Sequence, residues 1–304
     1  MDMRALLVDP AAPGALRLGT VPEPEPAPHE LLLDVRHISL NRGEVAFAAR
    51  RPAGTVHGYD AAGVVARAAA DGSGPAVGAR VAVFGGGAWA QRMAAATDAV
   101  AEVPERVGLR EAAALPMAGL TALRALRARP LLGRRVLITG AAGGVGRYAV
   151  QLAALGGAHV IASVGSPARG AGLAELGAHR VTVGLDGVEG PLDLVLDTVG
   201  GAQLGAVFAL LGPGGNIQCI GSASGEPAVF EPQALFFVGE ARTLSTYGDI
   251  SSPGPDLATL LGLLAAGRLR PEIGWQGGWE RYPEAAEALL ERRVTGKAVL
   301  DVGR

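Results

Sequence analysis

A glycine-rich run between two apolar segments carries the clearest chemical signal in this chain. Gly140–Gly146 follows the apolar residues 136–139 and precedes a helical pattern that ends at Gly156, and a second apolar segment covers residues 159–164. Strand, glycine turn, helix and strand form a βαβ unit, whose strands are parallel. Free N–H groups and the helix dipole at such a turn attract a diphosphate. The context favours a dinucleotide site over the alternative, a glycine-rich turn of a generic α/β domain.

The residues that follow the second apolar segment bear on which nucleotide binds. About 20 residues after the glycine run, NAD-binding domains usually place an Asp or Glu that holds the ribose 2′-hydroxyl. This chain has Ser163, Ser166 and Arg169 there, and no carboxylate. Hydroxyls and a guanidinium suit a 2′-phosphate, which a carboxylate would repel. We therefore predict NADPH rather than NADH. The alternative is that Ser166 only caps the next helix and Arg169 is a solvated surface residue.

The elements that must position these residues fall into two domains. Residues 1–112 contain many short strands broken by Gly and Pro, which predicts a distorted β-barrel. Over residues 113–249 helices alternate with apolar strands, including a predicted helix at 173–176, so we expect a doubly wound parallel sheet. Residues 250–304 end in a strand over 296–302 that returns to the first domain. The prediction is an α/β chain with an inter-domain cleft as its natural ligand site.

Composition excludes several classes of protein. The 304 residues are 49% hydrophobic and carry a formal net charge of −2, with an isoelectric point of about 6.2, which gives no electrostatic case for nucleic acid or a membrane surface. Cys219 is the only Cys, so a disulfide framework or a four-cysteine zinc lobe is excluded. No signal-like segment or long apolar run is present, and we expect a soluble cytoplasmic protein. Lys297 is the only Lys, which we interpret as base-composition bias.

Six segments, taken as a set, resemble one enzyme family. They are Ser39–Glu44, Gly58–Val65, Leu115–Leu123, Thr139–Gly146, Leu194–Gly201 and Gly296–Leu300. In this order the chain resembles the zinc-free medium-chain dehydrogenases/reductases, closest to the quinone oxidoreductase and zeta-crystallin branch, with polyketide-type enoyl reductases as cousins. The resemblance implies a GroES-like β-barrel domain of residues 1–112 and 250–304, and a Rossmann domain of residues 113–249. It also implies a homodimer.

The resemblance allows the metal question to be asked residue by residue. In zinc enzymes of this family, Cys, His and Cys hold the catalytic ion. The matching positions here carry Asn41, Tyr59 and Met117. Zinc takes thiolate, imidazole or carboxylate, so none of these is a ligand for such a site, and Asp60 alone could not hold the ion. The expectation is therefore a site without metal.

Without a Lewis acid, another group must polarise the substrate. The resemblance implies that Asn41 and Tyr59 line the pocket beside the nicotinamide, where an amide and a phenol can donate to a quinone or enone oxygen. Either Tyr59 or solvent supplies the proton. The alternative is that Tyr59 only packs at a strand end. Tyr247 is a further candidate substrate contact.

The resemblance also assigns the nucleotide contacts. They comprise the glycine turn, the candidate 2′-phosphate residues and positions along the ribose and nicotinamide. In full, they are Thr121, Ala141, Gly143, Gly144, Val145, Gly146, Ser163, Ser166, Arg169, Thr198, Val199, Gly221 and Ser222. Relatives often add a Tyr in the next strand; this chain has none there, and Arg180 is the candidate substitute.

These observations predict an NADPH-dependent, metal-free oxidoreductase that passes hydride to a quinone or an α,β-unsaturated carbonyl. Catalysis would come mainly from positioning and electrostatics, because the cofactor carries the hard chemistry. The first alternative is a pathway-specific enoyl thioester reductase. The second belongs to another class: a low-turnover NADPH-binding protein with a structural or sensor role. Steady NADPH consumption with several acceptors separates the enzymes from the binding protein.

Overall fold

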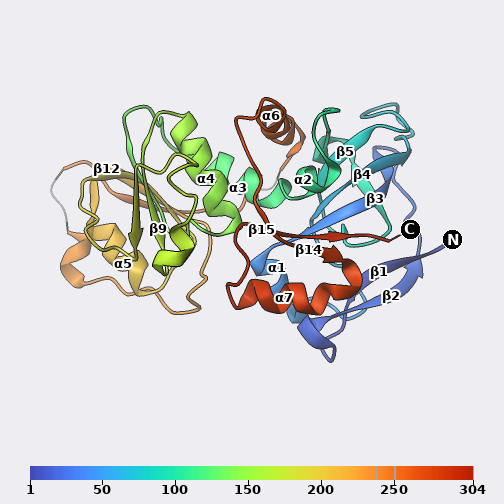
Figure 1. The fold of residues 1–304 in the computed structure, drawn as a ribbon, viewed down its shortest axis with the longest axis horizontal. Coiled ribbons are helices and arrows are strands. Elements are labelled where there is room, and N and C mark those ends of the chain that lie inside the picture. Colours follow the sequence, from blue (N-terminus) through green and yellow to red (C-terminus); the bar gives the residue numbers. More distant parts are fainter. Residues whose placement is uncertain (237–238, 250, 304) are drawn as a thin grey trace. The chain divides into compact units, whose positions relative to one another are not determined.

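The computed structural model describes residues 1–236, 239–249 and 251–303, which divide into two compact units (Figure 1). Unit 1 comprises Met1–Leu120 and Ile250–Arg304, and unit 2 comprises Thr121–Asp249. The first division falls inside helix α3 (Pro116–Leu126), and not between residues 112 and 113. The start of α3 is bonded to unit 1, because the backbone N–H of Met117 donates to Asp60.

Unit 1 is built on a seven-stranded mixed sheet in the order β14-β15-β3-β4-β5-β7, with β6 paired to β3. The β14–β15 pair is parallel and the other pairs are antiparallel. A separate hairpin joins β1 (Asp2–Val8) and β2 (Leu16–Pro22). The strands of the sheet are β3 (Glu30–Leu40), β4 (Asp60–Arg67), β5 (Arg80–Phe84), β6 (Arg92–Ala96), β7 (Val100–Glu102), β14 (Ile273–Gly278) and β15 (Lys297–Asp301).

The long strand β3 organises this sheet. One of its edges pairs with β4, and the other pairs with β6 near its start and with β15 near its end. At that end Ser39 lies opposite Asp60, and Leu40 lies opposite Ala298. Since β4 and β15 both run antiparallel to β3, the carboxyl end of β3 lies beside the amino ends of both neighbours. This register gathers residues from three distant parts of the sequence at one end of the sheet.

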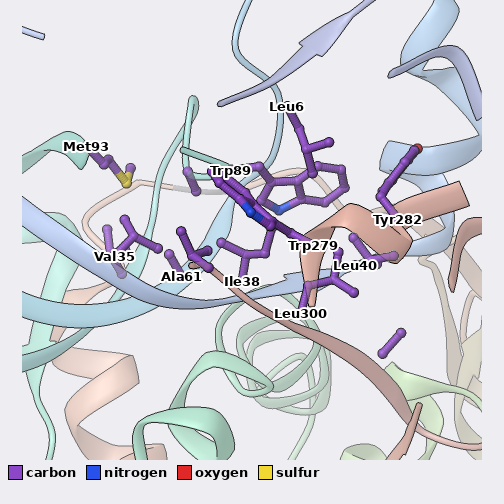
Figure 2. Close-up of a cluster of buried hydrophobic side chains, with 14 of the residues drawn as sticks. Leu6, Val35, Ile38, Leu40, Ala61, Trp89, Met93, Trp279, Tyr282 and Leu300 are labelled. Carbon is purple, nitrogen blue, oxygen red and sulfur yellow. The ribbon is translucent and has the colours of Figure 1, made fainter. Parts of the chain in front are cut away.

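Large apolar side chains fill the core of unit 1 (Figure 2). Trp89, Trp279 and Tyr282 are almost wholly buried there, and the rings of Trp89 and Tyr282 lie 6.0 Å apart. The Tyr282 hydroxyl donates to the carbonyl of Gly14, so the buried phenol has a partner. The helices of this unit are α1 (Arg42–Phe47), α2 (Leu109–Ala113), α6 (Gly254–Ala265) and α7 (Tyr282–Leu290).

Unit 2 has a six-stranded sheet whose strand pairs are all parallel, in the order β10-β9-β8-β11-β12-β13. This confirms the predicted doubly wound sheet, with the change of direction between β8 and β11, where such sheets bind ligands. Helices α4 (Gly144–Leu155) and α5 (Ala202–Ala209) connect strands of this sheet. The strands are β8 (Arg135–Ile138), β9 (His159–Val164), β10 (Arg180–Val183), β11 (Leu192–Asp197), β12 (Leu211–Cys219) and β13 (Thr243–Thr246).

The predicted helix over residues 173–176 is wrong. The connection from β9 to β10 contains the short 3₁₀ helix η4 (Pro167–Gly170) and then a series of turns. Gly172 and Gly177 flank the predicted helix and adopt φ values of +75° and +106°. The four residues between them are too few to nucleate a helix in water.

In the part of the chain described here, no helix is both long and apolar enough to cross a bilayer.

Candidate active site

Four polar side chains meet where β3 ends and β4 and β15 begin. The Asn41 amide nitrogen donates to Asp60 Oδ2 at 2.9 Å and to Glu44 Oε2 at 2.5 Å. Lys297 Nζ donates to Asn41 Oδ1 at 2.5 Å and lies 3.2 Å from Asp60 Oδ2. Asp60 is fully buried, while Lys297 is 2% and Glu44 is 6% exposed. We refer to Asn41, Glu44, Asp60 and Lys297 as the buried polar cluster.

The charges of this cluster balance only when one carboxyl group keeps its proton. Burial, followed by the neighbouring charge of Asp60, raises the pKa of Glu44 to about 8. Burial also raises the pKa of Asp60, while Lys297 and the hydrogen bonds from Asn41 and Met117 oppose that shift. Neutral Glu44 therefore leaves Asp60 and Lys297 as one compensated ion pair. This is the form in which buried charges are tolerated.

The amide of Asn41 is fully used inside the cluster. A primary amide offers two N–H donors and one carbonyl acceptor. Both donors point to carboxyl oxygens of Glu44 and Asp60, and the amide oxygen accepts from the Lys297 ammonium. Asn41 therefore holds its neighbours in place. Its predicted donation to a substrate oxygen stays a prediction, and it requires one of these hydrogen bonds to be exchanged for a bond to substrate.

Tyr59 immediately precedes β4 and is half-buried. Its ring packs against Phe84 with centroids 5.8 Å apart. Its hydroxyl oxygen accepts a hydrogen bond from Nη2 of Arg51, whose guanidinium carbon lies 5.9 Å from the Tyr59 ring centroid. A phenol can accept and donate at once, so the Tyr59 proton points away from Arg51. This hydroxyl can donate a hydrogen bond to a ligand oxygen.

The residues at the zinc-binding positions of relatives do not fit a zinc ion in this chain. Asp60 Oδ1 accepts from the backbone N–H of Met117 at 2.8 Å, and its Oδ2 accepts from Asn41 and Lys297. The Lys297 ammonium thus already supplies the positive charge at Asp60. Within residues 1–236, 239–249 and 251–303, no three His, Cys, Asp or Glu side chains lie close enough to hold a metal ion.

In unit 2, the start of helix α4 fits a dinucleotide diphosphate. Gly143 is the N-cap residue, no side chain caps the helix, and its first turn has no acidic residue. The first N–H groups of a helix have no intrahelical partner, so these remain available to phosphate oxygens. A Cβ on Gly146 would lie 2.5 Å from the Cα of Ala141 and from the Gly140 carbonyl oxygen. Only glycine lets the helix begin this close to the turn.

Other predicted nucleotide contacts lie at the same edge of this sheet. Thr139 Oγ1 donates to buried Asp197 at 2.6 Å, and Thr198 Oγ1 donates to the Thr139 carbonyl at 2.9 Å, so the ends of β8 and β11 interlock. The Gly221 N–H donates to the Asp197 carbonyl, which joins the end of β12 to them. Carboxyl ends of parallel strands are where such folds bind nucleotides. The predicted residues at this edge are Ala141, Gly143, Gly144, Val145, Gly146, Thr198, Val199, Gly221 and Ser222.

The predicted 2′-phosphate residues differ in what their side chains already contact. Ser163 is buried, and its hydroxyl donates to the Gly184 carbonyl at 2.7 Å, so in this arrangement its proton is unavailable to a phosphate. Ser166 precedes η4, is half-buried and makes no capping hydrogen bond through its side chain. The Arg169 N–H donates to the Ser166 carbonyl, which keeps these two residues in one turn.

Arg180, the suggested substitute in the phosphate clamp, lies at the beginning of β10 and not at its carboxyl end, which is Val183. Its guanidinium lies over Gly187. Phosphates bind at the opposite, carboxyl edge of such sheets. Of the remaining candidates, Thr121 is buried in α3, and Tyr247 is half-buried beyond β13 with its N–H bonded to the Cys219 carbonyl.

Sequence reasoning missed three residues of the unit 1 site: Glu44, Arg51 and Lys297. Lys297 carried a signal, because it is the one Lys among 27 basic residues. An ammonium is compact and donates in three directions, so it suits a small buried site that a planar guanidinium would not. Glu44 follows Asn41 by three residues, a spacing that favours contact at a helix start. Nothing in the sequence distinguishes Arg51 from the other arginines.

Comparisons with known proteins identify relatives of this chain. Residues 172–300 match a family model described as zinc-binding dehydrogenase. The chain is 31% identical to a chloroplastic quinone oxidoreductase of Triphysaria versicolor over 98% of both chains. It is 33% identical, over 90% of its length, to 13% of a spectinabilin polyketide synthase protein of Streptomyces orinoci. A mycobacterial protein in complex with NADPH has the same fold, with a TM-score of 0.87 and 26% identity over 98% of this chain and 99% of that one.

Proposed function

This chain belongs to the medium-chain dehydrogenase/reductase family, on its quinone-oxidoreductase-like branch, and we propose that it is an NADPH-dependent, metal-free reductase of quinones or α,β-unsaturated carbonyls. The observation that carries this proposal is the Lys297–Asp60 ion pair. It lies among the residues at the zinc positions of relatives, and it already compensates the Asp60 charge. A site without a Lewis acid needs hydrogen-bond donors to polarise its substrate, and Tyr59 supplies one.

Unit 2 contributes nucleotide binding in this proposal. The N–H groups at the start of α4 would hold the diphosphate, and Ser166 with Arg169 would hold the 2′-phosphate. NADPH, when bound, supplies the hydride. The absence of a carboxylate near Ser166 supports the phosphorylated nucleotide, as does a related structure described as complexed with NADPH.

Unit 1 contributes the polarisation of the acceptor. The Tyr59 hydroxyl donates to the carbonyl oxygen of the acceptor and draws electron density from the conjugated system. The buried polar cluster fixes the first residue of β4, Asp60, and thereby the backbone that carries Tyr59. The proton that completes the reduction comes from Tyr59 or from solvent. In this proposal Asn41 positions the site and Tyr59 contacts the substrate.

A conjugated acceptor is favoured on electrostatic grounds. Hydride addition to an isolated ketone concentrates negative charge on one alkoxide oxygen, which zinc enzymes of this family neutralise with the metal. A quinone or enone instead spreads that charge over its conjugated system. Neutral hydrogen-bond donors such as the Tyr59 hydroxyl are then sufficient, because the charge to be stabilised is weaker at any one atom.

An enoyl thioester is a second candidate substrate. It is favoured by the match to a polyketide synthase segment, which covers 90% of this chain. Its thioester carbonyl would use the same Tyr59 donor, so the two candidates differ in the acceptor and share the chemistry. We further propose that the protein is cytoplasmic and forms a homodimer. A low-turnover NADPH-binding protein is the outcome if no acceptor is reduced.

The test is a nucleotide titration followed by an acceptor screen. NADPH and NADH are titrated against the protein, and the NADPH-saturated protein is then offered simple benzoquinones, enones and an enoyl thioester. We expect tighter binding of NADPH than of NADH, and saturable NADPH oxidation with at least one acceptor class. Binding without oxidation of NADPH by any acceptor would favour the low-turnover binding protein. Failure to bind either nucleotide would refute the proposal.

A further inference from the structure

Arg51 is a cation with unused donors beside the Tyr59 hydroxyl. It follows the short 3₁₀ helix η2 (Ala48–Arg50) and is exposed. One guanidinium nitrogen donates to the Tyr59 oxygen. A guanidinium has five N–H groups in a planar fork, so most of its donor capacity remains. In the described part of the chain, no carboxylate forms an ion pair with Arg51.

Neighbouring arginines of unit 1 are used differently. Arg42 donates to the carbonyls of Leu289 and Leu290, and so ties α1 to α7. Arg50, adjacent to Arg51 in the chain, stacks its guanidinium on the Phe47 ring at 4.4 Å. Arg51 is the arginine whose guanidinium donates to the Tyr59 hydroxyl. Arg50 is consequently a matched control, since it has the same charge, the same turn and a different contact.

We propose that Arg51 and Tyr59 form one oxyanion-binding pair, in which the phenol O–H and a free guanidinium N–H donate to the same acceptor oxygen. This inference rests on the proposed function. When hydride adds to the electrophilic carbon of an enone, a π electron pair moves to the carbonyl oxygen and leaves an enolate. When hydride adds to one oxygen of a quinone, the displaced π electrons move through the ring to the other oxygen and leave a hydroquinone anion. The nicotinamide is oxidised, the acceptor is reduced, and a proton from Tyr59 or solvent then neutralises the oxyanion. Arg51 stays protonated throughout.

The link between the two residues makes the pair more effective than either donor alone. A hydroxyl that accepts from a cation becomes a stronger donor, because hydrogen bonds in a chain polarise one another. The guanidinium also brings full positive charge to an oxygen that is neutral before hydride transfer and anionic after it. Interactions that strengthen in the transition state raise kcat more than they change KM. Arg51 is therefore expected to act on turnover, and less on affinity for neutral acceptors.

The first experiment uses 4-nitrophenol as an oxyanion probe and needs no turnover. Its ionised form absorbs visible light, so the ionised fraction of the bound probe can be read at constant pH with and without NADP. We expect the wild-type protein and Arg50→Gln to bind the phenolate and raise the ionised fraction. Arg51→Gln should lose this effect. No phenolate binding by the wild type, or an equal ionised fraction in Arg51→Gln, overturns the inference.

The second experiment measures steady-state NADPH oxidation. Removing an oxyanion donor costs about 100- to 1,000-fold in enclosed sites, and for this exposed Arg51 we expect about 10- to 100-fold in kcat. In Arg51→Gln the KM for NADPH should be unchanged. The control Arg50→Gln should match the wild type in kcat, and Arg51→Lys should recover part of the rate. Because both donors act on one oxygen, Tyr59→Phe combined with Arg51→Gln should lose less than the product of the single losses.

The two experiments separate failure of the inference from failure of the proposed function. A wild-type protein that oxidises no NADPH with any acceptor refutes the proposed function, whatever the probe shows. A wild-type protein that turns over, with Arg51→Gln equal to Arg50→Gln in kcat, refutes the oxyanion pair alone. A double variant whose loss in kcat equals the product of the two single losses would show that Arg51 and Tyr59 act at separate places. That result would also contradict the oxyanion pair.

Discussion

The ammonium of Lys297 lies 3.2 Å from Asp60 Oδ2, and the fold buries both side chains almost completely. The pair joins the first residues of two strands that flank β3, and Asn41, the residue after β3, bridges them. Three segments far apart in sequence are therefore held at one end of the sheet by charge and hydrogen bonds. The Tyr59 backbone depends on this arrangement, because it is bonded directly to Asp60 along the chain.

Removing Lys297 should destabilise unit 1. Lys297→Met leaves Asp60 as an unpaired buried charge, and we expect a loss of about 3–5 kcal/mol in unfolding free energy. All three Trp residues (89, 275 and 279) belong to unit 1, so Trp fluorescence in a urea titration reports this unit. Lys297→Met combined with Asp60→Asn should recover much of the loss. A change below about 0.5 kcal/mol, typical of surface substitutions, would mean that the pair is not buried in solution.

Glu44 should make unit 1 less stable as pH rises. Burial raises its pKa in the folded chain to about 8, from an ordinary value of 4.5, so the folded state keeps a proton that the unfolded state has lost. Stability is then fully present below the unfolded pKa, and it falls as pH rises towards the folded pKa. Glu44→Gln still accepts the hydrogen bond from Asn41 and should remove this slope. Trp-monitored urea unfolding at several pH values between about 5 and about 9 measures it. Identical slopes in the two proteins would contradict the assignment.

Gly146→Ala should weaken nucleotide binding. The new Cβ would meet backbone atoms of Gly140 and Ala141 at 2.5 Å, and backbone cannot move aside as a flexible side chain can. Overpacking of this kind costs about 1–3 kcal/mol, so a loss of about 5- to 150-fold in NADPH affinity is expected. Gly262→Ala in α6 is the matched control, because no atom lies within 4 Å of its Cβ position and it is outside the predicted nucleotide contacts. NADPH fluorescence titration of both variants gives the comparison, and equal affinities would place the nucleotide elsewhere.

Arg169 and Ser163 should differ in their effect on nucleotide choice. Arg169→Gln is expected to lower NADPH affinity by about 10- to 100-fold, the loss of a charge-assisted hydrogen bond, with little change for NADH. Ser163→Ala should leave the preference nearly unchanged, because its hydroxyl already donates to Gly184. Titration of each variant with both nucleotides measures the ratio. A preference lost in Ser163→Ala and kept in Arg169→Gln would reverse our assignment.

The sheet of unit 2 could be predicted because its signals are local. Strands β8 and β9 are short, mainly apolar runs, and glycines mark the turn at Gly140–Gly146 and the end of α4 at Gly156. Side-chain direction was harder to predict. Ser163 stands at the right place in the chain for a phosphate, yet its hydroxyl turns to Gly184, whose position follows from the pairing of β9 with β10.

Two residues of the site in unit 1 could be predicted from the sequence, but the contacts among its residues could not. Asn41 and Lys297 are 256 residues apart, and their contact depends on the register of β15 against β3, which no local pattern encodes. The hydrogen bonds of the Asn41 amide depend on that register, so they could not be predicted from the sequence either. Resemblance identified the Asn41 and Tyr59 positions, while Arg51, one arginine among many, became visible only through its contact with Tyr59.

The central claim is that this chain reduces a conjugated acceptor with NADPH and no metal. The most direct test is NADPH oxidation by protein dialysed against a strong chelator, with the metal content of the same sample measured by mass spectrometry. We predict undiminished turnover of a quinone or enone at far less than one zinc per chain. Turnover that disappears with the chelator and returns on addition of zinc would contradict the claim.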